Sequence, residues 1–319
     1  MRRQASRGDV LFFFFRIVVP GMNKLRISVV QYLNTAPLVW GFTRGPQRGK
    51  YELSFTVPSR CAEELRSGAA DVAIIPAIEY QRMDGLAVLP RLAIASRQRV
   101  RSLLLICKTP IEQARRIALD SSSRSTQALT HILCREKWKI SPEMHQCAPH
   151  LGDMLARVDA ALLIGDPALR ISIEIAGRTE IAADRHQICE GAAAGIAGAE
   201  RLHVYDIVEE WRALTGLPAV LAVWAAKRNV ITPELIEDFQ RSRELGMANL
   251  AVISREASGE LGLPAMELER YLRENIDFAL DEENLDGLRR YFAEAARLGL
   301  IARAKPLEIA ALGMARARD

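Results

Sequence analysis

The chain has 319 residues, of which 49% are hydrophobic and 26% are charged, as in an ordinary globular protein. This length allows one large domain or two of moderate size. The formal net charge is +4, yet the sequence has no dense block of Lys and Arg with interleaved aromatic residues, so we expect no nucleic-acid partner. The five scattered cysteines are odd in number and have no C-x-x-C spacing, which predicts neither a zinc site nor a disulfide framework.

The N-terminal residues 1–22 combine three arginines with the apolar run VLFFFFRIVV. Arg16 interrupts that run, which is too short to span a bilayer, and no small-x-small cleavage site follows it. We therefore expect residues 1–22 to be a disordered extension or an upstream start, with translation from Met22. The expected protein is cytoplasmic and has no membrane partner.

Residues 25–40 (LRISVVQYLNTAPLVW) begin as a short apolar strand, pass through a polar turn and restart as a helix near Pro37. A strand that opens through a polar turn into a helix delivers side chains and free backbone N–H groups to a cleft. The pattern predicts Asn34 at the mouth of that cleft. The alternative is that Asn34 simply caps the helix, because Asn is a favoured N-cap.

The next stretch alternates strands with helix starts. Ser59 is a plausible N-cap for a helix that Gly68 ends. Glu79 follows a buried strand and could be a base, although a carboxylate on a solvated helix face is more common. The strands predicted in this half cover residues 51–58, 71–75, 86–94 and 102–107.

The same pattern restarts in the second half. A strand over residues 116–119 leads into the hydroxyl-rich residues 120–126 (DSSSRST), which we call the serine turn, and then into a helix over 127–138. The buried strand 159–164 ends at a helix start with Asp166 as N-cap and Pro167 at the first helical position. DVAIIPAIEY and DAALLIGDPAL are alike enough to indicate two α/β lobes built in the same way.

The remaining sequence predicts a strand over 219–225 that returns the chain to the first lobe, and then helices over 233–258, 264–279 and 282–298, in which we find no chemistry. We therefore predict an α/β fold of two lobes with the ligand between them. The first lobe comprises residues 23–108 and 226–319, the second residues 111–222, and two crossover segments form a hinge.

The serine turn is the strongest local signal for ligand binding. The N–H groups at the following helix start, together with Ser123, Ser125 and Thr126, would hold a carboxylate or phosphate, and Arg124 could add charge. Ordinary helix capping by a serine-rich turn is the alternative. The five histidines form no metal-ligand or triad spacing, and there is no P-loop or dinucleotide fingerprint, so we expect no metal and no cofactor. From the residues alone, a cleft without an obvious base suggests a solute-binding protein.

Five motifs occur in an order that resembles the chorismate dehydratase (MqnA) family of the futalosine route to menaquinone: SVVQYLNTAPLVWG, SGAADVAIIPAIEY, ALDSSSRSTQAL, DAALLIGDPAL and TGLPAVLAVWAAK. The likeness runs from about residue 25 to residue 227. It implies a type II periplasmic-binding-protein fold used as a cytoplasmic enzyme. The family removes water from chorismate to give 3-[(1-carboxyvinyl)oxy]benzoate, and is thought to use the enolpyruvyl carboxylate of the substrate as the base.

By this resemblance Asn34 is the active-site asparagine, with Tyr32 and Thr35 beside it, and Ser102 is the serine before the last strand of the first lobe. The residues implied to bind the substrate elsewhere are Ser122, Ser123, Arg124, Ser125, Thr126, Gly165 and Asp166. Two other functions stay open. One is a 1,4-dihydroxy-6-naphthoate synthase of the same pathway, which relies on a histidine base and for which His145 and His150 are candidates. The other is a non-catalytic solute-binding protein. The sequence does not fix an oligomeric state.

Overall fold

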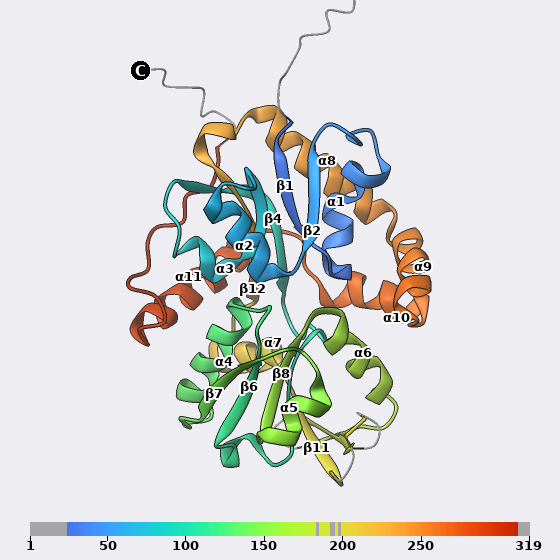
Figure 1. Cartoon of the computed structure of the whole chain (residues 1–319), viewed down its shortest axis with the longest axis vertical. Helices are drawn as coiled ribbons and strands as arrows, with labels where there is room; N and C mark the ends of the chain where they lie inside the picture. The colour runs from blue at the N-terminus through green and yellow to red at the C-terminus, as the bar shows by residue number, and fades with distance from the viewer. Residues whose placement is uncertain (1–23, 183–184, 192–194, 197–198, 312–319) are drawn as a thin grey trace, which may run out of the picture.

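The computed structural model describes residues 24–182, 185–191, 195–196 and 199–311. The predicted extension 1–22 therefore lies outside the described residues. The molecule is elongated and has two lobes, each built around one sheet, with the last helices of the chain on the first lobe and at its junction with the second (Figure 1). Among the described residues, no helix has both the length and the apolar character needed to cross a membrane.

The sheet of the first lobe has five strands in the order β2-β1-β3-β12-β4. β1 runs parallel to β2 and β3, whereas β12 is antiparallel to β3 and β4. β3 is buried along its whole length, as the continuous apolar run predicts. The strand bounds are β1 Arg26–Val30, β2 Glu52–Thr56, β3 Val72–Pro76, β4 Leu86–Ser96 and β12 Ala219–Lys227.

The sheet of the second lobe has seven strands in the order β7-β6-β8-β5-β11-β10-β9. β6 is parallel to β7 and β8, and the pairings of β5, β9, β10 and β11 are antiparallel. The strand bounds are β5 Leu103–Cys107, β6 Arg116–Asp120, β7 Glu143–Cys147, β8 Ala160–Ile164, β9 Glu180–Ile181, β10 Gln187–Glu190 and β11 Arg201–Asp206.

The two lobes repeat one arrangement. The order β2-β1-β3 in the first sheet matches β7-β6-β8 in the second, and in each case an antiparallel strand from the other half of the chain follows: β12 beside β3, and β5 beside β8. The likeness of the two sequence motifs thus corresponds to equivalent places in the two sheets, at β3 and β8.

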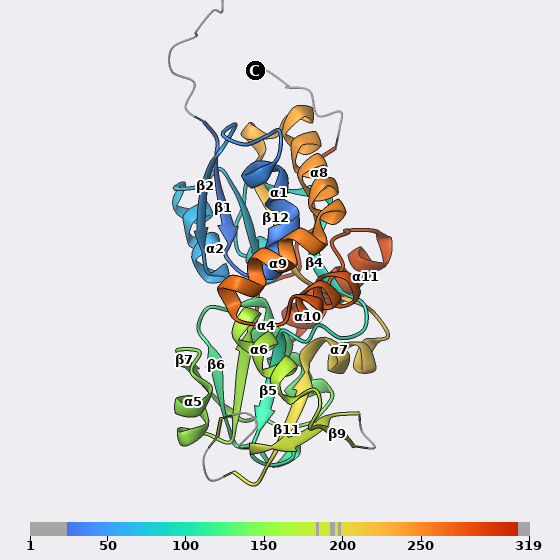
Figure 2. The same cartoon turned by 90° about the vertical axis from the view of Figure 1, so that its right-hand side faces the viewer.

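Helices cover both sheets (Figures 1 and 2). The helices before the crossover back to the first lobe are α1 Ala36–Arg44, α2 Pro58–Ser67, α3 Ala77–Tyr80, α4 Ser125–Glu136, α5 Leu151–Arg157, α6 Gly165–Ile175 and α7 Ile207–Thr215. Those after it are α8 Pro233–Ala248, α9 Leu250–Leu261, α10 Ala265–Arg270 and α11 Glu282–Arg297. A 3₁₀ turn, η1, covers Leu33–Thr35, and a π-helical turn, η5, covers Tyr271–Asn275.

Three features differ from the sequence prediction. β5 pairs with β8 and β11, so residues 103–107 belong to the second sheet rather than the first, and β12 up to Lys227 belongs to the first sheet. Strand pairing is decided by long-range contacts, which a local pattern does not contain. The predicted helix 233–258 is two helices that meet at Asn249, whose side-chain N–H donates to the Leu245 carbonyl. The predicted helix 264–279 gives way to η5 after Arg270.

The carboxyl ends of the central parallel strands in both sheets point to the junction of the lobes. β1, β3, β6 and β8 each lead there into a polar turn or directly into a helix: α1, α3, α4 and α6 respectively. In open α/β sheets this edge is where ligands bind, because the helix N-termini expose unpaired N–H groups there.

Prediction for the fold: Gly246→Ala should lower the free energy of unfolding by about 1–3 kcal/mol, because the close contact of α8 with α1 leaves no room for a side chain. A Cβ at this position would lie 1.9 Å from the Pro37 carbonyl oxygen. Urea unfolding measures the effect. The matched control is Gly259→Ala on α9, where a Cβ meets nothing within 4 Å and the substitution should raise stability by up to ~1 kcal/mol. Equal stability of the Gly246 variant and the wild type would contradict this packing.

Candidate active site

A pocket lies between the lobes, at the strand ends described above. Its volume is about 50 Å³, small compared with the roughly 300–1,000 Å³ of typical ligand sites. Residues of the two lobes contact each other beside it. The lining residues are Val30, Tyr32, Asn34, Pro58, Pro76, Ile94, Leu103, Ser123, Ser125, Thr126, Ile164, Gly165, Leu221 and Ala222, which we call the interlobe pocket.

Tyr32 of the first lobe packs directly on Gly165 of the second. Gly165 has φ +66°, and a Cβ there would lie 2.6 Å from Cε2 of the tyrosine ring, so the position requires glycine for both reasons. The Tyr32 hydroxyl lies 3.3 Å from Ser122 Oγ. Burial raises the pKa of Tyr32 to about 12. The phenol is therefore protonated near neutral pH and cannot act as a base.

Asp166 makes the second contact between the lobes. Its carboxylate oxygens accept the Leu33 backbone N–H at 3.1 and 3.3 Å, at the start of η1. The expectation that Asp166 caps its own helix is wrong, because α6 already begins at Gly165 and Asp166 lies within its first turn. Burial raises the pKa of Asp166 to about 6, against the hydrogen bond from Leu33, which lowers it.

Asn34 and Ser102 lie close together through a third residue, Tyr271. Asn34 is in η1, only 9% exposed, and does not cap α1. The Tyr271 hydroxyl donates to Ser102 Oγ at 2.9 Å and lies close to the Asn34 side chain. The Ser102 carbonyl accepts the Gly165 N–H at 2.8 Å, so Ser102 lies directly behind the pocket wall. Ser102 precedes β5, which is in the second sheet and not, as expected, the last strand of the first lobe.

The serine turn places the N-terminus of α4 at the pocket. Asp120 organises this turn by accepting the Ser122 N–H at 2.9 Å and the Ser122 hydroxyl at 2.6 Å. Ser123, Ser125 and Thr126 then line the pocket. The first N–H groups of a helix have no partner within it, so the first turn of α4 is suited to bind an anionic group.

Three residues that the sequence singled out make contacts within the protein. The Arg124 guanidinium pairs with Glu63 at 2.8 Å and lies 3.6 Å from Glu79, so it does not line the pocket. The Thr35 hydroxyl donates to Asn34 Oδ1 at 3.4 Å. Ser59 is not the N-cap of α2, which is Val57. Its backbone N–H instead donates across the junction to the Ser122 carbonyl at 3.0 Å.

Glu79 is not on a solvated helix face. Its carboxylate is fully buried and contacts three arginines: Arg66, Arg82 at 2.8 Å and Arg124 at 3.6 Å. Both carboxylate oxygens of Glu79 are thus engaged by guanidinium groups. Glu79 therefore joins helices of the two lobes and is not a candidate base.

The interlobe pocket has a distinctive chemistry. Its lining contains hydroxyl, amide and backbone N–H groups but no Asp, Glu, His, Cys, Lys or Arg. Among the described residues, no group of three or more His, Cys, Asp or Glu is arranged to hold a metal ion. His145 is on β7, an edge strand, and the exposed His150 precedes α5; neither lines the pocket. The pocket thus suits a small anion that needs positioning more than it needs a protein base.

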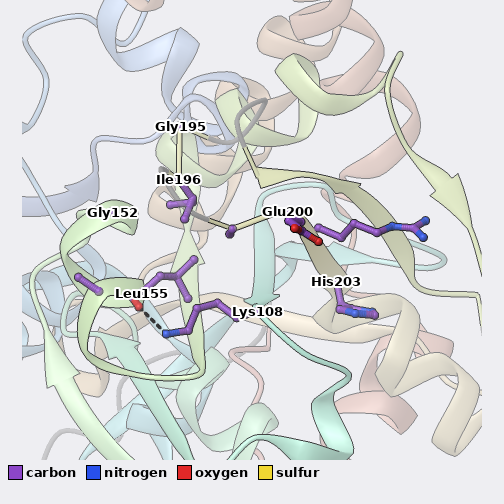
Figure 3. Close-up of a pocket in the computed structure, with 10 residues that line it drawn as sticks. Lys108, Gly152, Leu155, Gly195, Ile196, Glu200 and His203 are labelled. Carbon is purple, nitrogen blue, oxygen red and sulfur yellow. Dashed lines mark hydrogen bonds between the residues drawn. The ribbon is translucent and has the colours of Figure 1, made fainter.

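A wider hollow of about 820 Å³ opens in the second lobe near Lys108 and His203 (Figure 3). Because β5 starts beside the interlobe pocket at Leu103 and ends at Cys107, Lys108 is at the opposite end of the lobe. The Lys108 ammonium group donates to the Leu155 carbonyl at 2.9 Å. This hollow therefore brings together none of the residues expected to carry the chemistry.

Two parts of the site could not be found from the sequence. The apolar walls come from strand ends in both lobes, including Ile94, Leu103 and Leu221. Tyr271 comes from the C-terminal helices, where no chemistry was expected. Its only local signal is an aromatic residue on the buried side of a charged helical segment, which is typical of any packed helix.

Two lobes of like topology, with a ligand pocket where their strand ends meet, define the class of periplasmic-binding-protein-like folds. Solved structures of other proteins have a similar fold. A protein of Archaeoglobus fulgidus matches with a TM-score of 0.63 and 18% identity, covering 87% of this chain and 98% of that one. The periplasmic aliphatic sulphonate binding protein SsuA of Escherichia coli matches with a TM-score of 0.56 and 12% identity. The match covers 92% of this chain and 96% of that one. At such identities the likeness concerns the fold alone.

The particular family follows from the sequence comparison. Residues 25–297 match the family described as menaquinone biosynthesis, and the chain belongs to that family. It is 29% identical, over 281 residues, to the chorismate dehydratase of Thermus thermophilus, covering 88% of this chain and 97% of that protein. The family resemblance expected from the five sequence motifs is thereby confirmed.

Prediction for the lobe contact: Gly165→Ala should lower the free energy of unfolding by about 2–4 kcal/mol. The cost combines a left-handed backbone conformation with the overlap on the Tyr32 ring. Thermal or urea unfolding measures it. Gly152→Ala on α5, where a Cβ meets no atom within 4 Å, is the control and should not destabilise the protein. Tolerance of alanine at Gly165 would show that Tyr32 does not pack there.

Prediction for pH dependence: Asp166→Asn should remove part of the pH dependence of stability. The folded-state pKa of Asp166, about 6, lies above its ordinary value of 3.8. The folded state therefore holds this proton more tightly, and the associated stability is fully present below about pH 4 and lost as pH rises through 6. At about 1.4 kcal/mol per pKa unit, the wild type should lose up to ~3 kcal/mol more than the variant between pH 4 and 7. Parallel stability curves for the two proteins would contradict the raised pKa.

Proposed function

We propose that this protein is a chorismate dehydratase, which eliminates water from chorismate to give 3-[(1-carboxyvinyl)oxy]benzoate for menaquinone biosynthesis. The reaction class is that of a carbon–oxygen lyase without cofactor. Membership of the menaquinone family and the chorismate dehydratase of Thermus thermophilus support the substrate. The observation that carries the proposal is the pocket lining, which offers neutral hydrogen-bond donors and no protein base.

Chorismate carries two carboxylates, and the first turn of α4 suits one of them. Its unpaired N–H groups and the hydroxyls of Ser123 and Thr126 are neutral hydrogen-bond donors, and no Lys or Arg lines the pocket. Hydrogen bonds from neutral donors to a carboxylate are charge-assisted and hence stronger than neutral pairs. Arg124 is held by Glu63, so it contributes to the architecture of this turn and not to the substrate charge.

The chemistry makes modest demands on the protein. The enolpyruvyl carboxylate takes the proton from ring carbon C3, the electrons of that C–H bond form the new ring double bond, and the C4 hydroxyl leaves. The proton and the hydroxyl together make one water, and the ring becomes aromatic. Because the base is part of the substrate, the protein has to orient it, stabilise the departing hydroxyl and exclude solvent.

Asn34 and Ser102 are placed for these tasks. Asn34 lines the pocket from the first lobe, and its amide can hold the substrate by hydrogen bonds without competing for the proton. Ser102 lies behind the wall at Gly165. The Asp166 carboxylate is engaged with the Leu33 N–H and is not in the pocket lining.

Substrate entry requires the lobes to separate, because a cavity of about 50 Å³ does not hold a ten-carbon ring acid. The two segments between the sheets, residues 97–102 and 207–218, are the places where such a motion can occur. Closure then brings Tyr32 onto Gly165 and excludes water. No observation favours the naphthoate synthase alternative, since neither His145 nor His150 lines the pocket.

Prediction for catalysis: Asn34→Ala and Asn34→Asp should each reduce turnover of chorismate by at least about 100-fold, with the fold retained. Alanine removes the orienting amide, and aspartate places a negative charge beside the substrate carboxylates. Formation of the aromatic product, followed by its ultraviolet absorbance and by mass spectrometry, measures turnover, and circular dichroism confirms folding.

The same assay separates the competing functions. A solute-binding protein would bind chorismate without forming product, and a naphthoate synthase would leave it unchanged. Full activity of both Asn34 variants would remove Asn34 from the mechanism, and no turnover by the wild type would exclude the dehydratase.

A further inference from the structure

Tyr271 is a buried tyrosine that directly follows α10, the helix that lies near the junction of the lobes (Figure 2). It begins η5, the π-helical turn that follows α10. Isolated π-helical turns are rare and occur often at functional sites, where they direct a side chain that a regular helix would point elsewhere. Its side chain is 1% exposed, so its hydroxyl must find its partners within the protein.

The hydroxyl reaches both residues proposed to act on the substrate. The Tyr271 hydroxyl donates to Ser102 Oγ at 2.9 Å, and the Asn34 side chain lies close to the same oxygen. Burial raises the pKa of Tyr271 well above its ordinary value, so the phenol stays protonated and remains a donor. One hydroxyl from the C-terminal helices thus joins a residue of η1 to a residue that precedes β5.

The backbone around Ser102 is held in an unusual conformation. Arg101 has φ +62°, a left-handed value that is uncommon for a residue other than glycine. The buried Asp206 carboxylate maintains it by accepting the backbone N–H groups of Val100 at 3.0 Å and Arg101 at 2.6 Å. The Arg101 guanidinium in turn pairs at 3.0 Å with Glu267 of α10, four residues before Tyr271. The turn and the helix are therefore fixed relative to each other.

This geometry determines where the Ser102 proton can point. A serine hydroxyl has one hydrogen to donate and lone pairs to accept. Ser102 Oγ uses a lone pair to accept the hydrogen bond from Tyr271. Within the described ranges no acceptor for the Ser102 hydrogen is observed. The Ser102 hydrogen therefore has no partner among the described residues, and Ser102 lies just behind the Gly165 wall of the pocket.

We propose that Tyr271 is a positioning residue for the dehydration: its hydroxyl orients Ser102 so that the Ser102 hydrogen is directed to the pocket side, toward the departing hydroxyl of the substrate. The inference rests on the proposed function, because the departing group is that of chorismate. Tyr271 does not touch the substrate itself. Its effect should therefore appear in the chemical step and should depend on Ser102.

The test compares Tyr271→Phe with the wild type in steady-state turnover of chorismate. Removing the hydroxyl should lower kcat about 10- to 100-fold while KM changes less than about threefold, because the residue orients the reacting groups without binding the substrate. The matched control is Tyr80→Phe. This change removes the hydroxyl of another buried tyrosine, which hydrogen-bonds, among the residues that the structure describes, to the Pro306 carbonyl and the Glu308 N–H. Its kcat should be unchanged, and its urea midpoint shows the effect on stability of losing one buried hydroxyl.

A double-mutant cycle with Ser102→Ala separates positioning from general destabilisation. If Tyr271 acts through Ser102, adding Tyr271→Phe to Ser102→Ala should cost less than about threefold in kcat. An additive loss, or an undiminished kcat in Tyr271→Phe, would overturn the positioning role. If the wild type itself yields no aromatic product from chorismate, the proposed function fails, and the role of Tyr271 in it fails with it. If the wild type turns over chorismate and Tyr271→Phe has the same kcat, the positioning role is rejected while the proposed function stands.

Discussion

The contact between Tyr32 and Gly165, together with the Asp166 carboxylate on the Leu33 N–H, is the interaction on which the site depends. It joins the turn after β1 to the turn after β8, and so brings the strand ends of both lobes to one place. Without it Asn34 and the first turn of α4 would face separate solvent surfaces. The requirement for glycine at a position with φ +66° is the local constraint that permits this approach.

Carboxylates near the junction serve the architecture rather than the chemistry. Asp120 accepts the Ser122 N–H in the serine turn, and Asp206 accepts the Arg101 N–H in the turn before Ser102. Asp166 accepts the Leu33 N–H, and Glu79 is surrounded by arginines. What remains at the pocket is a set of neutral donors among apolar walls. Such a site cannot take up a proton easily, but it can hold an anion that carries its own base. The same scaffold that binds solutes in other proteins can thereby support an elimination.

The sequence predicted the two-lobed α/β fold, the buried strands β3 and β8, and the placement of Asn34 and the serine turn at the junction, because strand–turn–helix patterns are local. It failed where distant residues decide the outcome. The sheet to which β5 belongs depends on β8 and β11, the direction of the Arg124 side chain depends on Glu63, and the link from Tyr271 to Ser102 spans 169 residues. β7 was missed because none of its residues is buried and its sequence EMHQC has no apolar run.

The most direct test of the account is the position of the product in crystals grown with 3-[(1-carboxyvinyl)oxy]benzoate. We expect one carboxylate on the N–H groups at the start of α4 and the ring beside Asn34, between Tyr32 and the apolar walls. Density for the product in the hollow near Lys108 and His203, or anywhere outside the interlobe pocket, would contradict the account.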